Sequence, residues 1–113
     1  MLIAVYGSLK KGQYNFDRFI QSGFNLEFVK EEVINGFDLY DLGYYPGVKV
    51  TSSNNPLTIH ILQVDQECFK VLDRMEKGAG YSQKVVATSA GDAILWVYEG
   101  DISMCRKIPS GNY

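Results

Sequence analysis

The chain has 113 residues, 46% of them hydrophobic, and a formal net charge of −2 at pH 7. This length suits one domain with a real hydrophobic core, so we expect a single domain over residues 1–113. The charge is nearly balanced and the lysines and arginines are scattered, which argues against a nucleic-acid partner.

The N-terminal half begins with a strand, a turn and a helix. Leu2–Val5 is a short apolar run with β-branched residues, typical of a buried strand. Phe16–Ile20 has helical spacing and reaches a natural stop at Gly23, with Asn15 as the expected helix cap. Further strands are expected at Glu27–Asn35, Phe37–Leu42, Gly47–Thr51 and Leu57–Ile61, the last extended to Val64 with a change of face after Ile61.

The C-terminal half contains a second helix and two more strands. Asp65 is a good N-cap for a helix from Gln66 to about Glu76. Strands are expected at Gln83–Ser89 and Ala93–Tyr98, and residues 100–113 are expected to form a short irregular tail. Strands outnumber helices, so the predicted fold class is α+β.

The turn between the first strand and the first helix is the most informative segment. Tyr6–Asn15 reads YGSLKKGQYN, with two glycines five residues apart. Such a turn can aim several main-chain N–H groups at one spot and bind a small anion. The spacing matches a nucleotide P-loop, but Gln13 and Tyr14 replace the lysine and hydroxyl residue that hold phosphate and magnesium. A carboxylate site and a plain turn that needs glycine for positive φ remain as alternatives.

Compartment and metal chemistry are constrained by the rest of the composition. The N-terminal apolar run Leu2–Tyr6 is too short for a signal peptide or membrane span, so we expect a cytoplasmic protein. Cys68 and Cys105 are widely spaced and are expected to be free thiols. The single His60 cannot supply a histidine cluster, so we expect no metal site. The sequence leaves the oligomeric state open.

Three blocks occur in a characteristic order. They are Y-G-S-L-K-K-G-x-x-N at residues 6–15, G-F-D-L-Y with Y-Y-P-G within residues 34–47, and L-D-R-M-E followed by Tyr81. Together they resemble the γ-glutamylcyclotransferase-like family, closest to its γ-glutamylamine cyclotransferase branch, over about Leu2 to Tyr98. The resemblance implies a small, partly closed mixed β-barrel with a few flanking α-helices.

The resemblance also implies an activity. The enzyme would release 5-oxoproline and an amine from a small-molecule γ-glutamyl amine or amide, with no cofactor, and Glu76 would be its general acid/base. Two features of the residues agree with that role, because a helix C-terminus and the nearby Asp73 both disfavour the ionised form. A carboxyl group with a raised pKa suits a general base near neutral pH. The alternative is a solvated glutamate at a helix end.

The same resemblance assigns the substrate-binding residues. The substrate α-carboxylate would bind the N–H groups of Gly7, Ser8 and Leu9, with Tyr6 shaping the pocket and the Tyr81 hydroxyl orienting the substrate. Tyr44, Tyr45 and Pro46 could rim this pocket, and Lys10 and Lys11 are expected to be solvated surface residues.

Four positions depart from the family pattern. Ile59, His60 and Leu62 replace a glycine, a glutamate and a tyrosine, and Gln83 replaces an arginine. Since glycine in a strand permits close approach, we expect Ile59 to narrow or reshape the cavity. These changes favour an alternative function, a non-catalytic small-molecule-binding or interaction protein on the same scaffold. A third possibility is a hydrolase or transferase acting on a γ-glutamyl group carried by a larger molecule.

Overall fold

The short strand β1 (Leu2–Val5) lies at the centre of the main sheet in the computed structural model, which describes residues 1–113. It pairs antiparallel with β5 (Pro56–Val64) and parallel with β7 (Gly91–Tyr98). β2 (Leu26–Asn35) and β6 (Tyr81–Thr88) complete a five-stranded sheet in the order β2-β5-β1-β7-β6. Both pairing directions occur, so the predicted mixed sheet is confirmed.

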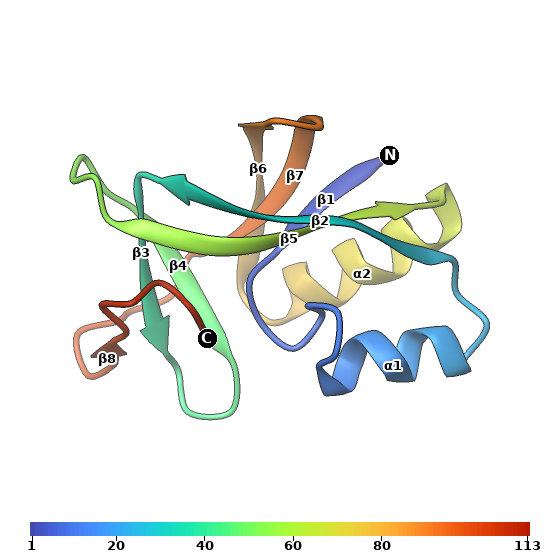
Figure 1. Ribbon diagram of the computed structural model, residues 1–113. Coiled ribbons are helices and arrows are strands. Elements are labelled where there is room, and N and C mark those ends of the chain that lie inside the picture. The colour runs from blue at the N-terminus through green and yellow to red at the C-terminus, as the bar shows by residue number, and fades with distance from the viewer.

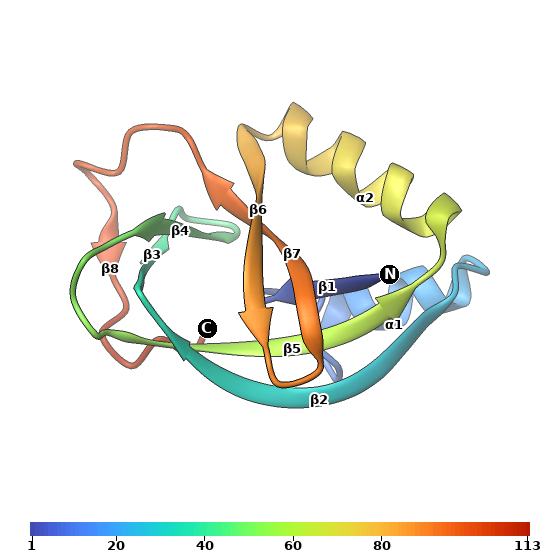
Figure 2. The ribbon, with the colours of Figure 1, turned by 90° about the horizontal axis from the view of Figure 1, so that it is seen from above.

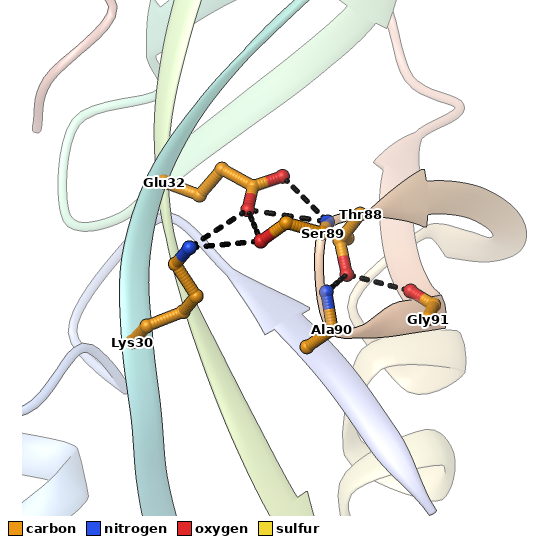
Figure 3. Close-up of polar contacts among 6 residues, drawn as sticks. All are labelled: Lys30, Glu32, Thr88, Ser89, Ala90 and Gly91. Atoms are coloured by element: carbon orange, nitrogen blue, oxygen red, sulfur yellow. Dashed lines mark hydrogen bonds and ion pairs between the residues drawn. The ribbon is translucent and has the colours of Figure 1, made fainter.

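The five-stranded sheet curls until its two edges approach each other (Figure 2). In the β6–β7 turn, Ser89 donates its main-chain N–H to Glu32 Oε2 on β2 at 3.1 Å, and its hydroxyl bonds the same carboxylate (Figure 3). Lys30 Nζ donates to Ser89 Oγ at 2.9 Å. No strand pairing joins β2 to β6, so these hydrogen bonds to side chains bring the edges together and the barrel is only partly closed.

The two faces of this sheet bury separate cores, and the buried apolar residues of β5 switch from one face to the other along its length. Ile59 and Ile61 pack in one buried cluster, whereas Leu62 and Val64 pack in the other. Opposite this point the register of β2 shifts and leaves Val29 without a partner. Such a bulge bends the sheet, and the predicted change of face after Ile61 is confirmed.

Each core is covered by different elements (Figure 1). α1 (Tyr14–Gln21) and α2 (Gln66–Gly78) cover one of them, through residues such as Phe19 and Leu72. A small sheet in the order β4-β3-β8 covers the other, through residues such as Leu39 and Val48. Its strands are β3 (Phe37–Asp41), β4 (Pro46–Val50) and β8 (Arg106–Lys107). The α+β class is therefore confirmed.

Two local predictions are wrong. The segment 100–113 is not wholly irregular, because β8 pairs with β3 and places Ile108 against the core that the small sheet covers. Asn15 does not cap α1 but lies inside it, and the cap position belongs to Gln13, which makes no side-chain capping bond. The second cap is confirmed, since Asp65 Oδ1 accepts from the Cys68 N–H at 2.8 Å. Neither helix has the length and apolar character needed to cross a membrane.

Candidate active site

A cavity of ≈ 200 Å³ opens where β1 ends, between the main sheet, both helices and the β3–β4 turn. Most of the residues that line it are hydrophobic. All the site residues predicted from the sequence line it: Tyr6, Gly7, Ser8, Leu9, Glu76 and Tyr81. The fold thus brings together three sequence blocks that are far apart in the chain.

The loop after β1 lines this cavity and contains main-chain donors that have no acceptor in the protein. The Lys10 N–H donates back to the Gly7 carbonyl at 3.0 Å, and the Asn15 N–H donates to the Ser8 carbonyl at 3.1 Å. The N–H groups of Gly7, Ser8 and Leu9 donate to no acceptor in the protein, and all three residues line the cavity. Consecutive unpaired N–H groups at a concave surface form a site for a small anion.

The two glycines of this loop serve different purposes. A Cβ atom at Gly7 would lie only 2.8 Å from Pro46 Cγ, so glycine is needed there for close packing against the β3–β4 turn. Gly12 has open space around it but adopts a φ of +88°. The plain-turn interpretation therefore holds for Gly12 and not for Gly7.

Side chains outside the cavity hold the loop in place. His60 Nδ1 accepts from the Lys11 main-chain N–H at 2.9 Å, and His60 Nε2 lies 3.0 Å from Glu31 Oε1. Because Nδ1 accepts, the ring carries its proton on Nε2, which donates to Glu31. On the cavity side, Asn15 Nδ2 donates to Ser8 Oγ at 2.6 Å. His60 therefore supports the loop from behind rather than contributing to the cavity wall.

Lys10 is not the solvated lysine that the sequence predicts. Its side chain is buried, with 5% of the residue exposed, and Nζ donates to Asn112 Oδ1 at 2.8 Å and to the Tyr113 carbonyl at 3.0 Å. Burial lowers the pKa of Lys10, and the nearby charge of Glu31 partly opposes that effect. The C-terminal segment is thereby fastened to the loop. Lys11 is exposed as expected, with Nζ 4.9 Å from the Phe28 ring centroid.

Glu76 lies in the last turn of α2 and faces the cavity. Burial, and then repulsion from Asp73, raises the pKa of its carboxyl group from 4.5 to about 7. Protonated and ionised forms are therefore both well populated near neutral pH. Such a group can accept a proton in one step and return it in the next.

Asp73 is held ionised by three donors. Lys77 Nζ lies 2.8 Å from Oδ2, while Gln83 Nε2 and Trp96 Nε1 donate to Oδ1 at 2.8 and 3.1 Å. Burial acts to raise the pKa of Asp73, but these hydrogen bonds and the lysine charge together lower it. Gln83 thus supplies a neutral donor where the family pattern has an arginine, and adds no charge to offset the carboxylate.

Two tyrosine hydroxyls at the cavity are fixed by main-chain carbonyls. Tyr6 donates to the Trp96 carbonyl at 2.7 Å, and Tyr81 donates to the Pro46 carbonyl at 2.5 Å. Burial is the main cause that raises the pKa of both phenols, and Glu76 adds to it, so both stay neutral. A hydroxyl that donates its proton can still accept a hydrogen bond. Both oxygens therefore retain acceptor capacity.

Some residues lie elsewhere than the sequence predicts. Tyr45 and Pro46 line the cavity, but Tyr44 is 97% exposed and does not. Ile59 is fully buried in the core that the small sheet covers and does not line the cavity. Its side chain therefore cannot reshape the cavity directly.

Sequence reasoning missed Trp96. It lines the cavity, its carbonyl fixes Tyr6 and its indole bonds Asp73. In the sequence, Trp96 is the chain's only tryptophan and lies in an apolar strand. That pattern predicts no more than core packing.

Both cysteines are free, as predicted. Burial raises the pKa of the Cys68 thiol to about 11. No cluster of three or more His, Cys, Asp or Glu side chains could hold a metal ion.

Comparison with known proteins places this chain in a family. The family model described as gamma-glutamyl cyclotransferase, AIG2-like, matches residues 3–113. The gamma-glutamylcyclotransferase family protein YtfP of Citrobacter rodentium is 30% identical over 114 residues, covering 100% of this chain and 95% of that protein.

Two solved structures agree with that assignment. The crystal structure of an uncharacterized protein from Pyrococcus horikoshii has a TM-score of 0.81 and 31% identity, covering 99% of this chain and 88% of that one. The solution structure of the protein ytfP from Escherichia coli has a TM-score of 0.79 and 28% identity, covering 100% and 96%. The chain therefore belongs to the gamma-glutamyl cyclotransferase, AIG2-like family.

Proposed function

We propose that this protein is a γ-glutamyl cyclotransferase that releases 5-oxoproline and an amine from γ-glutamyl amines or amides. Family membership supports a cyclotransferase-type function. The observation that supports the specific reaction is the pairing of two groups in one cavity. A carboxyl group with a pKa of about 7, Glu76, shares the cavity with the free N–H groups of Gly7, Ser8 and Leu9.

These two groups suit the two charges of an α-amino acid. The substrate α-carboxylate accepts from the loop N–H groups, which can bind an anion without any cationic side chain. The α-ammonium group then lies toward Glu76, with the Tyr6 and Tyr81 oxygens as further acceptors. The γ-carbonyl folds back toward the nitrogen in this pose. Ring closure is intramolecular, so holding the substrate in this folded shape lowers the barrier.

Glu76 carries the protons in this reaction. In its ionised form it takes a proton from the α-ammonium, and the freed amine attacks the γ-carbonyl carbon. Protonated Glu76 then gives that proton to the leaving nitrogen, and the bond between the γ-carbon and that nitrogen breaks. Attack leaves the α-nitrogen positively charged, so it gives its second proton to ionised Glu76, which passes this proton to the released amine. Over the whole reaction the α-nitrogen therefore loses two protons and the leaving nitrogen gains two. No water is consumed, and Glu76 ends in the form in which it began.

The binding-protein alternative depends on the departures at Ile59, His60 and Gln83. None of these side chains lines the cavity. Ile59 packs in the core, His60 supports the loop and Gln83 bonds Asp73. No observation at the site therefore favours loss of turnover, and we retain catalysis as the proposed function.

A direct assay tests this proposal. Purified protein is incubated with a panel of γ-glutamyl amines and γ-glutamyl peptides, and 5-oxoproline is quantified. Glu76→Gln keeps the shape of the side chain but cannot exchange protons, so turnover should fall by roughly 10²–10⁴-fold. Glu67→Gln, at an exposed position of the same helix, is the matched control and should keep normal turnover.

Circular dichroism of both variants confirms that they fold. Unchanged turnover in folded Glu76→Gln would remove Glu76 from the mechanism. No 5-oxoproline from any member of the panel would overturn the proposed function itself.

A further inference from the structure

The cavity contains a single charged side chain. Glu76 is the only Asp, Glu, Lys, Arg or His among the residues that line it. The rest of the wall is mainly apolar, and its larger side chains are Leu9, Phe19, Met75 and Trp96 together with the rings of Tyr6, Tyr45 and Tyr81. No cationic side chain and no second carboxylate line this cavity.

The charged residues nearby are already engaged elsewhere. Lys10 Nζ is bonded to Asn112 and the Tyr113 carbonyl, so it points to the C-terminal segment and not into the cavity. Asp73 is bonded to Lys77, Gln83 and the Trp96 indole. Lys77 and Asp73 line a separate shallow depression, which does not include Glu76. None of these groups is free to neutralise a further charge on the substrate.

The charges of the cavity therefore match those of one α-amino acid and no more. The loop N–H groups accommodate the α-carboxylate, and Glu76 accommodates the α-ammonium. We infer that the preferred substrates are γ-glutamyl amides of uncharged, apolar amines, such as alkyl or aryl amines, rather than amides that carry a second ammonium or carboxylate. This inference rests on the proposed function, and it specifies the amine half of the substrate.

Two physical effects act in the same direction. A charged group that enters an apolar wall loses hydration and finds no partner there. An alkyl chain in the same position gains from leaving water, by roughly fourfold in affinity for each buried methylene group. A neutral chain should therefore be preferred over a charged chain of equal length, by tenfold or more in kcat/KM.

Three γ-glutamyl amides of matched length test this preference. They are the n-pentylamide, the 5-aminopentylamide with a terminal ammonium, and the 4-carboxybutylamide with a terminal carboxylate. We expect kcat/KM for 5-oxoproline release to be at least tenfold higher with the n-pentylamide than with either charged amide. Equal or faster turnover of a charged amide would overturn the inference while leaving the proposed cyclotransferase function in place.

A binding measurement separates selectivity from turnover. The same amides are titrated calorimetrically into Glu76→Gln, whose loss of the carboxylate affects their common α-amino acid part equally. Tightest binding of the n-pentylamide supports the inference, and equal or tighter binding of a charged amide overturns it. Absence of 5-oxoproline from all three amides with the unsubstituted protein would count against the proposed function, and the binding order would still decide the preference.

One substitution should offset the preference for a neutral chain over a carboxylate. Met75 lines the cavity and is half-exposed, so Met75→Lys can place an ammonium at the wall without burying it. The ratio of kcat/KM for the carboxybutylamide to that for the pentylamide should rise about tenfold in this variant. Met75→Leu keeps the wall apolar and should leave the ratio unchanged. An unchanged ratio in Met75→Lys would show that the amine half does not lie against this wall.

Discussion

The two sides of the cavity obtain their chemistry in opposite ways. The loop that carries Gly7, Ser8 and Leu9 offers main-chain N–H groups, whose character is the same in any environment. The end of α2 offers a carboxyl group whose behaviour depends wholly on its surroundings, since burial and Asp73 move the pKa of Glu76 to about 7. The loop depends on conformation, whereas Glu76 depends on its electrostatic environment.

This difference predicts how each side responds to substitution. The loop should be sensitive to changes of shape and insensitive to pH, because its donors do not titrate. The Glu76 side should be sensitive to pH and to nearby charge. Keeping its carboxyl group in this environment should also lower the free energy of unfolding. A carboxyl group with a raised pKa is a group that the folded state keeps from ionising.

The largest expected effect is a pH-dependent gain in stability from Glu76→Gln. Below pH 4.5 the carboxyl group is protonated in both the folded and unfolded states and has no effect. As the pH rises toward 7 the unfolded chain releases this proton and the folded protein keeps it, so the native protein loses stability. The shift from 4.5 to about 7 corresponds to about 3 kcal/mol. Above pH 7 this loss is complete.

Urea unfolding at pH 4.5 and pH 8 measures this effect. The variant and the native protein should have similar free energies of unfolding at pH 4.5, and the variant should be more stable by up to about 3 kcal/mol at pH 8. The exposed control Glu67→Gln should show no such divergence. A variant that is no more stable at pH 8 would mean that the carboxyl group is solvated and not strained by burial.

On the loop side, Gly7→Ala should act through shape alone. The added methyl group would lie 2.8 Å from Pro46 Cγ, so the loop or the β3–β4 turn must move. Overpacking of this kind costs about 2 kcal/mol, and we expect a raised KM together with a lower melting temperature. Gly12→Asn is the control, since this position has open space and asparagine tolerates its positive φ. A loss that grows as the pH rises through 7 would contradict a purely steric effect.

A smaller effect is expected from the charge beside Glu76. Asp73→Asn keeps an oxygen acceptor for Trp96 and Gln83 but removes the negative charge. The pKa of Glu76 should then fall, and the acidic limb of the pH–rate profile should move to lower pH. The displacement should be less than that caused by burial, because burial is the larger cause of the raised pKa.

Lys77→Met provides the opposing control for this experiment. It leaves the Asp73 charge in place and removes the cation that partly offsets it. The acidic limb should not move to lower pH in this variant. If both variants displaced the limb in the same direction, the Asp73 charge would not be its cause.

Much of the fold could be predicted from the sequence because its signals are local. Alternation along β5 predicted the strand and its change of face, and Asp65 marked the start of α2. β8 could not be predicted, because two polar residues become a strand only by pairing with β3. The prediction that Lys10 is solvated was wrong for the same reason. Nothing near it in sequence shows that residues 112–113 return to cover its side chain.

The site residues show the same contrast between what the sequence predicts and what depends on tertiary structure. The order of the three blocks was enough to bring Glu76, Tyr81 and the loop to one cavity. The placement of the departures could not be predicted, because alternation along β5 puts Ile59 and His60 on opposite faces but does not tell what covers each face. Ile59 therefore turned out to be a core residue. His60, its neighbour on the opposite face, turned out to support the loop.

His60 gives the smallest expected effect and the finest comparison of the two sides. Its Nδ1 accepts from the Lys11 N–H, so His60→Leu should loosen the loop and leave that donor unpaired. Loss of one such hydrogen bond costs about 1 kcal/mol, or roughly a fivefold rise in KM with little change in kcat. His60→Asn places an oxygen acceptor near the position of Nδ1 and should recover most of the affinity. Neither variant should move the acidic limb of the pH–rate profile, because that limb reports Glu76. A shift of the limb, or a fall in kcat with unchanged KM, would show that the loop and the Glu76 side do not act independently.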